Sequence, residues 1–308
     1  MEFNIRNYFV APPGHILVFQ DAQQEEYRLL AHYGNDKNFL DMVNRGEDIH
    51  TGTAALLHGV PYDEVTQDMR NKGKTTNFGL VYGLGNPAFA KALGYDINED
   101  LIKKGTRVLY KNFQPWKIPP YNNTVTLREL LLSVGTITED ELAGIVYFMT
   151  PHVQEAITAA ADTKKQYFGR FPDIKNFIKE ASRVGSTRGY VKTWCDRRRH
   201  FKDPKNDGFK APNAIIQGGC GDIMKLKLHE VNQFLKPYQT KIVNNVHDEI
   251  GTLHPMIREE ILLIPQINRI LCDLPFRVPI GWDIEWGYKW GEKRKFTTIE
   301  ALMEELHL

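Results

Sequence analysis

Two aspartates follow apolar, strand-like runs at widely separated points of the sequence. Asp21 comes after "HILVF" (15–19), and Asp248 comes after "IVNNV" (242–246) with Glu249 beside it. Neighbouring carboxylates repel one another and lose hydration when they are partly buried, unless a cation neutralises them. If the two strand ends meet at one edge of a sheet, the aspartates can hold two divalent cations about 4 Å apart. Taken singly, each is also compatible with a blander role, a helix cap at Asp21 and a polar turn at "HDE".

A second group of candidate residues lies on one helix predicted within 63–85. Arg70, Lys74, Phe78 and Tyr82 follow one another at intervals of four residues. Four residues advance an α-helix by about 400°, so these side chains share one slowly drifting face. Two cations near a helix start suit a polyphosphate, and aromatic rings suit a sugar or a base. A solvated charged turn followed by core aromatics would give the same pattern.

The two groups together fit one chemistry, phosphoryl or nucleotidyl transfer from a triphosphate. Carboxylate oxygens suit Mg²⁺, which keeps several waters and binds substrate phosphates. Arginine and lysine neutralise the phosphates, and an aromatic ring positions the nucleoside.

The elements that must position these residues mix helices with antiparallel strands. A strand is expected at 15–19, a helix at 22–34, a capped helix at 46–59 and a long helix from about Thr66. Further expectations are a loop at 114–123, helices at 138–149, 156–184 (bent near Pro172), 211–235 and 257–273, a hairpin at 189–201, and strands within 241–253 and 277–290. No βαβ rhythm is visible, which favours an α+β fold.

The composition is that of an ordinary globular chain. It has 308 residues, 42% apolar and 25% charged, with a net charge of +1. That balance neither implies nor excludes a nucleic-acid partner, because only local patches bind phosphate. The three cysteines have no metal-ligand spacing and fit a reducing, cytosolic setting. No apolar run reaches membrane-span length and no signal peptide is visible.

The motifs resemble those of family A DNA polymerases, the family of bacterial DNA polymerase I and its phage relatives. "LVFQDAQQEEYRLLAH" resembles the first palm motif, D-Y-S-Q-x-E-x-R, and "VHDE" resembles the third motif in full. "MRNKGKTTNFGLVYG" matches every lettered position of the fingers motif, R-x-x-x-K-x-x-x-F-G-x-x-Y-G. Further segments, "DIHTGTAALLHGVP", "GYVKTWCDRRR", "NAIIQGGCGDIMK" and "DIEWGYKWGE", also resemble the family. The resemblance spans about residues 5–295 and is interrupted near 97–155.

The resemblance implies an antiparallel-sheet palm with a helical fingers subdomain. Residues 1–45 would be the first part of the palm, 46–188 the fingers with an insertion at about 97–155, and 189–308 the second part of the palm. Thumb and exonuclease domains would be absent.

The resemblance also implies a role for each matching residue. Asp21 and Asp248 would bind two Mg²⁺ ions, for which Mn²⁺ can substitute, with Glu249 as an accessory carboxylate. Lys74 would also protonate the departing pyrophosphate, and Glu26 would exclude a ribose 2′-hydroxyl. The residues implied to bind the nucleotide are Gln24, Glu26, His50, Arg70, Lys74, Phe78 and Tyr82. Those expected to contact DNA are Arg28, Asn213, Gln217, His247 and, within the basic run 197–199, Arg198, for which a solvated hairpin tip is the alternative.

Several positions depart from the family pattern. Ala22 and Gln23 replace the usual Tyr-Ser, and Glu25 adds a third acidic side chain where an apolar residue is usual. Phe209 stands where the family often has arginine, and "GGCGD" (218–222) replaces a more alanine-rich helix. These changes bear on fidelity and DNA contacts more than on the chemistry.

The expected function is template-directed DNA polymerisation from dNTPs on a primer–template. A single-subunit RNA polymerase-like enzyme, a metal-dependent nuclease and a non-catalytic, polymerase-derived DNA-binding subunit stay open as alternatives. Only 20 residues precede Asp21, so a second polypeptide carrying the thumb, and an exonuclease with it, is expected as a partner. The expected location is the cytoplasm, that of a bacterial host if the chain is phage-encoded, with no membrane partner.

Overall fold

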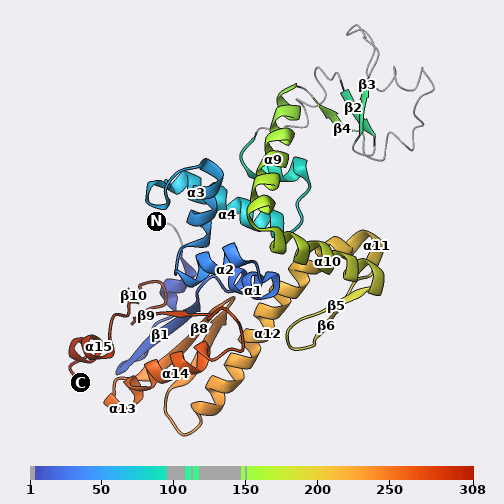
Figure 1. The fold of residues 1–308 in the computed structure, drawn as a ribbon. Helices are drawn as coiled ribbons and strands as arrows, with labels where there is room; N and C mark the ends of the chain where they lie inside the picture. The colour runs from blue at the N-terminus through green and yellow to red at the C-terminus, as the bar shows by residue number, and fades with distance from the viewer. Residues whose placement is uncertain (1–3, 96–107, 112–113, 118–146, 150) are drawn as a thin grey trace. The chain divides into compact units, whose positions relative to one another are not determined.

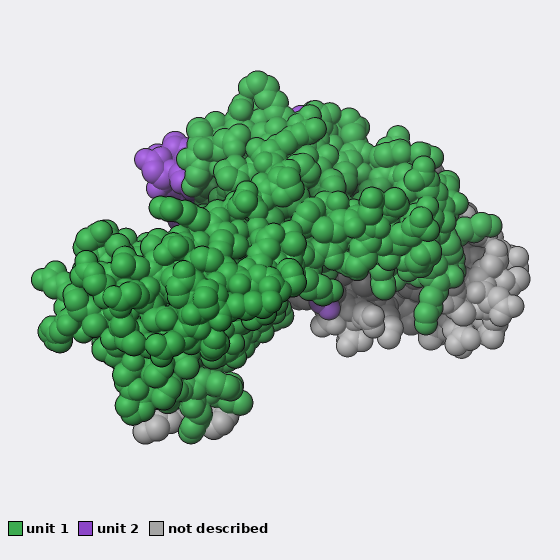
Figure 2. All heavy atoms as spheres, turned by 90° about the horizontal axis from the view of Figure 1, so that it is seen from below, with its two compact units in different colours: residues 1–49, 171–308 green, residues 50–170 purple. Residues whose placement is uncertain are grey.

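The chain forms two compact units. The computed structural model describes residues 4–95, 108–111, 114–117, 147–149 and 151–308. The first unit combines residues 1–49 with 171–308, and the second is residues 50–170, as coloured in Figure 2. The second unit is thus shorter at both ends than the 46–188 segment expected from the sequence, and residues 171–188 pack within the first unit.

An antiparallel five-stranded sheet is the centre of the first unit (Figure 1). Its strands are β1 (His15–Ala22), β7 (Lys241–Val246), β8 (Glu249–Pro255), β9 (Trp282–Gly287) and β10 (Arg294–Lys295), in the order β10-β9-β1-β8-β7. The strand predicted at 15–19 runs on to Ala22, so Asp21 lies inside the central strand rather than after it. The mixture of this sheet with helices confirms the α+β class.

Three helices near the C-terminus cover one face of the sheet. They are α13 (Arg258–Ile261), α14 (Leu263–Cys272) and α15 (Ile299–Glu305). Ile16 and Val18 of β1 are buried against them, and Gln20 accepts a hydrogen bond from Asn268 Nδ2 at 2.9 Å. Because side chains alternate along a strand, Leu17, Phe19 and Asp21 point to the opposite face. We call this face, which the three C-terminal helices leave uncovered, the open face; Trp290 packs on Leu17 and Phe19 there, and Asp21 is half-buried. It carries the candidate chemistry.

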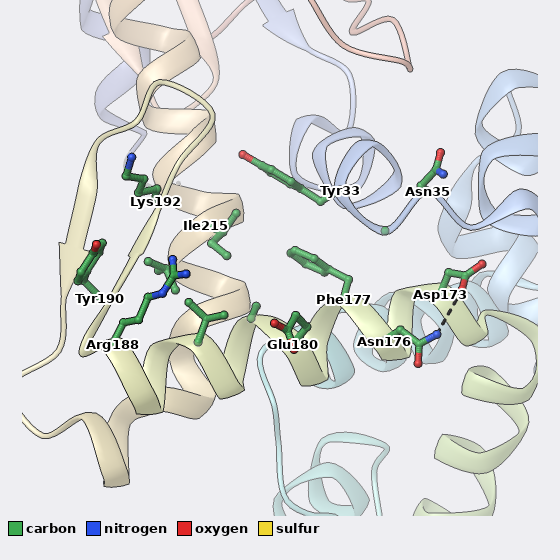
Figure 3. Close-up of a pocket in the computed structure, with 14 residues that line it drawn as sticks. Tyr33, Asn35, Asp173, Asn176, Phe177, Glu180, Arg188, Tyr190, Lys192 and Ile215 are labelled. Carbon is green, nitrogen blue, oxygen red and sulfur yellow. Dashed lines mark hydrogen bonds between the residues drawn. The ribbon is translucent and has the colours of Figure 1, made fainter.

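A long helix, α12 (Ala211–Phe234), packs against α1 (Glu25–Gly34), α10 (Pro172–Arg188) and α14. The remaining elements are η1 (Ile5–Tyr8), α2 (Lys37–Asn44), β5 (Tyr190–Lys192), β6 (Arg198–His200), α11 (Pro204–Asp207) and η3 (Gly208–Lys210). Between α1, α10 and the β5–β6 hairpin lies an open cavity of about 690 Å³. Figure 3 shows the rings of Tyr33 and Phe177 at this cavity, stacked with centroids 5.6 Å apart.

The second unit is mostly helical, with a small sheet. It contains α3 (Ile49–His58), which starts at the last residue of the first unit, η2 (Tyr62–Glu64), α4 (Gln67–Val81), α5 (Asn86–Ala92), α9 (Pro151–Arg170) and the strands β2 (Val108–Lys111), β3 (Gln114–Lys117) and β4 (Tyr147–Met149). The strands pair in the order β3-β2-β4. Two predictions are wrong here: 114–117 is a strand instead of a loop, and 147–149 is a strand instead of a helix. Residues 138–146 and most of the expected insertion at 97–155 lie outside the described residues.

Two residues, Thr66 and Gly73, determine where helix α4 begins and how closely it packs against α3. The side chain of Thr66 caps it by accepting a hydrogen bond from Met69 N at 3.3 Å. Gly73 faces α3 so closely that an added Cβ would lie 2.2 Å from the carbonyl oxygen of His50. Only glycine therefore allows the two helices this approach.

Among the described helices, none combines the length and the apolar character needed to cross a lipid bilayer.

Candidate active site

A row of three carboxylates crosses the open face of the sheet. In the register of the strands, Asp21 on β1 lies directly opposite Glu249 on β8 and Asp283 on β9. Residues paired across antiparallel strands share one face, so the three side chains are neighbours. Asp283 is not among the candidate residues expected from the sequence, because only the register of β9 brings it beside Asp21.

Asp248 joins this row through the turn between β7 and β8. The turn consists of His247 and Asp248, and His247 takes the left-handed conformation with φ 54°. The backbone N–H of Ala22 donates to the carbonyl oxygen of Asp248 at 3.0 Å, which fixes the turn to the end of β1. The two aspartates expected to meet are therefore brought together, with Asp248 half-buried and His247 exposed.

The electrostatics of Asp21 show how closely these charges lie. Its pKa is raised to about 6, first by partial burial and then by the negative charges of Asp248 and Glu249. Asp283 raises this pKa too, whereas the cation of Lys293 lowers it. Unneutralised carboxylates of this kind favour binding of a cation.

Glu249 is already engaged within the protein. Trp290 Nε1 donates to its Oε1 at 3.0 Å, and Lys293 forms an ion pair with its Oε2. Lys293 Nζ also lies 3.2 Å from Glu285 and 4.6 Å from the ring centroid of Phe19. Neither Lys293 nor Trp290 was singled out from the sequence. Glu249 therefore differs from Asp21 and Asp248 in having both oxygens occupied.

The donors present fit divalent cations that keep part of their hydration. In the described part of the chain, no group of three or more His, Cys, Asp or Glu side chains is arranged to hold a metal ion by itself. Mg²⁺ is typically held by one or two carboxylates together with waters and substrate phosphates. Asp21 and Asp248 supply that kind of incomplete ligand set.

Two of the predicted nucleotide-binding residues, Gln24 and Glu26, lie at the start of α1. Gln24 precedes the helix in the left-handed conformation, φ 49°, and its Nε2 donates to Asp48 Oδ2 at 2.9 Å. Glu26 accepts a hydrogen bond from Nε2 of Gln217 on α12 at 3.4 Å. Glu26 and Gln217 are therefore neighbours, although 191 positions separate them in the sequence.

Two residues predicted to contact DNA lie in different surroundings. Arg28 donates to the carbonyl oxygens of Gln23 at 2.9 Å and Pro279 at 2.5 Å, so it ties α1 to the segment before β9. Asn213 is half-buried, and its amide oxygen has no hydrogen-bond partner in the described structure. That oxygen of Asn213 is enclosed by the protein, and two donor nitrogens of Arg28 are used within the chain.

The unusual Glu25 is buried against α12. Its pKa is raised to about 8, mainly by burial and further by Asp248, while a hydrogen bond with Cys220 lowers it. One of its oxygens, Oε1, has no hydrogen-bond partner in the described structure. Glu25 therefore holds a proton near neutral pH beside the carboxylate row.

Arg197 and Arg198 of the β5–β6 hairpin have different surroundings. Arg197 Nε donates to Asp222 Oδ1 at 2.6 Å, and Thr193 Oγ1 donates to Asp222 Oδ2 at 2.5 Å. Arg198 is exposed, with its guanidinium 5.1 Å from the ring centroid of Tyr190. Arg197 thus holds the hairpin to α12, while Arg198 faces solvent.

In the second unit, three of the four residues of the predicted stripe on α4 form one continuous patch: Lys74, Phe78 and Tyr82. Lys74 Nζ lies 5.9 Å from the Phe78 ring centroid, and the Phe78 and Tyr82 centroids are 5.5 Å apart. The buried His50 adds its ring, 6.0 Å from that of Phe78, and its Nδ1 lies 3.3 Å from Asn77 Nδ2. Lys74 is exposed and Arg70, one turn earlier, is half-buried. The patch has the cationic start and aromatic end expected for a nucleoside triphosphate.

A sequence model described as DNA polymerase family A matches residues 1–115 and 144–292. The chain belongs to DNA polymerase family A. The unmatched residues 116–143 fall within the insertion expected at about 97–155.

Curated relatives are DNA polymerases I of bacteria. The chain is 26% identical over 300 residues to DNA polymerase I of Caldicellulosiruptor bescii. The aligned region covers 94% of this chain and 28% of the relative. It is 27% identical over 295 residues to the thermostable DNA polymerase I of Thermus thermophilus, covering 93% of this chain and 28% of that one. The chain therefore spans less than a third of the length of these relatives.

A solved structure shares the fold. The POL domain of Pol1 from M. smegmatis, in complex with DNA primer-template and dNTP, superposes with a TM-score of 0.68 at 24% identity. The match covers 93% of this chain and 42% of that one. It confirms the expected mixture of an antiparallel sheet and helices.

Proposed function

We propose that this chain is the catalytic core of a template-directed DNA polymerase. The 3′-hydroxyl of a primer attacks the α-phosphate of a dNTP, a new phosphodiester bond forms, and pyrophosphate leaves. The observation that carries the proposal is the meeting of Asp21 and Asp248 on the open face of the sheet. The family, and the primer-template and dNTP in the similar Pol1 structure, support the same substrates.

Asp21 and Asp248 would hold two Mg²⁺ ions, or Mn²⁺ in their place. Bound there, the metals would supply positive charge to the reacting phosphate and to the attacking and leaving oxygens. The mutual repulsion of the carboxylates supports this assignment, because a cation relieves it.

The patch on α4 would bind the incoming nucleotide. Arg70, Lys74 and His50 would hold the triphosphate, and Lys74 would give a proton to the departing pyrophosphate. Phe78 would flank the sugar and base, and Tyr82 would lie beside the templating base. Positive charges beside a triphosphate stabilise the negative charge that develops on its phosphate oxygens in the transition state.

Residues around α1 and α12 would select the sugar and hold the DNA. Glu26, with Gln24 near it, would exclude a ribose 2′-hydroxyl, which favours DNA synthesis over RNA synthesis. The residues that would contact primer, template or their backbones are Arg28, Asn213, Gln217, His247 and Arg198.

The location in the cytoplasm and the second polypeptide that would supply a thumb stay predictions. Recovery of a native complex by pull-down would test the partner, and a processive chain acting alone would contradict it.

Primer extension tests the proposed function. We expect wild-type protein with Mg²⁺ to extend a primer with dNTPs far better than with rNTPs. Asp248→Asn should lose on the order of 10³-fold or more in rate, because a carboxylate that holds the metals is removed. Asp63→Asn, a change at an exposed carboxylate in η2, is the matched control and should extend normally. An Asp248→Asn protein with near-normal rate would refute the site, and nucleotide release from DNA without dNTP would favour a nuclease.

A further inference from the structure

A lysine occupies the carboxylate site of the open face. Lys293 forms an ion pair with Glu249, lies 3.2 Å from Glu285, and is only 15% exposed. Its Nζ stands 4.6 Å from the ring centroid of Phe19, two residues before Asp21 on the same face of β1. A cation is therefore built into the protein beside the residues that would bind metal.

The backbone holds this lysine in place. Lys293 directly precedes β10, whose Arg294 pairs with Trp286 of β9. The turn before it closes tightly, since a Cβ on Gly287 would lie 2.6 Å from the carbonyl oxygen of Glu292. Trp290 in that turn donates to Glu249 and its ring stacks on Phe19, with centroids 6.2 Å apart. Both side chains that bind Glu249 thus come from one anchored turn.

The charges explain what this arrangement does. Asp21, Asp248, Glu249, Asp283 and Glu285 place five carboxylates around this site, and Lys293 cancels one of their charges. Glu249 has both oxygens occupied, so it is withheld from any second cation. A fixed positive charge repels a divalent cation twice as strongly as a monovalent one at the same distance.

We propose that Lys293 is a resident counter-cation that weakens binding of divalent metal to Asp21 and Asp248 until a nucleotide arrives. The inference rests on the proposed function, because it takes the two aspartates as metal ligands. Lys293 is a positioning residue: it fixes Glu249 and sets the net charge that a metal meets. The phosphates of a dNTP restore the negative charge that Lys293 removes, so metal occupancy becomes coupled to nucleotide binding.

The experiment measures Mn²⁺ binding without nucleotide or DNA, from the electron paramagnetic resonance signal of free Mn²⁺. Lys293→Met and Lys293→Gln remove the charge, and glutamine keeps a hydrogen-bond donor for Glu249. Both should bind Mn²⁺ at least tenfold more tightly than wild type. Lys293→Arg keeps the charge and should bind within about twofold of wild type.

Two control proteins locate the effect. Lys295→Met removes an exposed cation two residues away on β10 and should leave Mn²⁺ affinity unchanged. Combining Lys293→Met with Asp248→Asn should abolish the gain, because the metal ligand is lost. If the methionine variant fails to fold by circular dichroism, the glutamine variant carries the comparison.

The outcomes separate this inference from the proposed function. Unchanged Mn²⁺ affinity in the folded methionine or glutamine variant would overturn the inference, whereas primer extension by wild type would still support the function. Tighter binding in variants of a protein that never extends primers would support the counter-cation and overturn the polymerase. As a second readout, the Mg²⁺ concentration for half-maximal extension should fall several-fold in Lys293→Gln.

Discussion

Asp21 and Glu249 face each other across β1 and β8, yet their surroundings differ. Asp21 is surrounded by other carboxylates, and its pKa rises to about 6. Glu249 is bonded to Trp290 and Lys293 instead. Residue type alone thus does not decide which carboxylate is free to bind metal; the cations and donors beside each one do.

The raised pKa of Asp21 predicts a pH-dependent metal site. Below about pH 6 the carboxyl holds a proton that a metal must displace, so Mn²⁺ affinity should fall as the pH drops through 6 and level off above it. Binding titrations between pH 5 and 8 measure this midpoint. Asp283→Asn removes one of the negative charges that raise the pKa, so its midpoint should move to lower pH. A midpoint that is the same in both proteins would contradict the influence of Asp283 on Asp21.

Glu25 predicts a pH-dependent stability. Its carboxyl keeps a proton up to about pH 8 in the folded chain, against an ordinary pKa of 4.5. Between these values the unfolded chain binds fewer protons than the folded one, so the free energy of unfolding falls as pH rises. Glu25→Gln should therefore be more stable than wild type at pH 8.5, by on the order of 3 kcal/mol, and should lose this advantage near pH 4.5.

Urea unfolding at both pH values measures the effect of Glu25→Gln. Glu304→Gln changes an exposed carboxylate on α15 and is the matched control, with no pH-dependent gain. An equal stability difference at pH 4.5 and pH 8.5 would show that the proton on Glu25 is not the cause.

At the scale of elements, the junction of α3 and α4 depends on Gly73. A methyl group there would meet the backbone of His50 at 2.2 Å and of Ala54 at 3.0 Å. Gly73→Ala should thus destabilise the second unit by about 1–3 kcal/mol and displace the patch on α4 that is proposed to bind the nucleotide. Thermal unfolding and the KM for dNTP measure the two effects.

Gly169 on α9 is the matched control for that change. No atom lies within 4 Å of a Cβ built there, so Gly169→Ala should stabilise the helix by about 0.5–1 kcal/mol. If Gly73→Ala stabilised the protein as Gly169→Ala is expected to do, helix propensity would outweigh the close approach of the backbones at Gly73.

Elements with strong local signals could be predicted from the sequence. The long helix expected from about Thr66 is α4, and the apolar runs predict β1 and the β7–β8 pair. Residues 147–149 form a strand where the sequence predicts a helix, because a short apolar run fits either structure by periodicity alone. The strand at 114–117 was missed because its proline and the prolines that follow it read as a loop.

The candidate site was predictable only in part, because some of its members depend on strand register. Asp21 and Asp248 stand in recognisable motifs. Asp283 becomes a neighbour of Asp21 only through the pairing of β1 with β9, and Lys293 meets Glu249 only through the turn before β10. Contacts of this kind have no local signal, since residues far apart in the sequence make them.

At the scale of the whole molecule, the chain leaves the first unit after Ile49 and returns to it at Phe171. The core of that unit is accordingly built from both ends of the chain: Ile16 and Val18 are buried with Ile264 and Leu302. A loss of packing in this core should loosen segments remote in sequence while leaving the intervening residues unaffected.

Hydrogen exchange of two variants tests this division. Ile264→Ala leaves a cavity in the first core and should cost about 2–5 kcal/mol. Exchange should then speed up in β1, β8 and α12, while amides of α4 and α9 keep their wild-type rates. Gly73→Ala should give the converse pattern, with faster exchange in 50–95 and 151–170 only, because each substitution weakens contacts internal to one unit. Uniformly faster exchange in either variant would show instead that the chain unfolds as a single cooperative body.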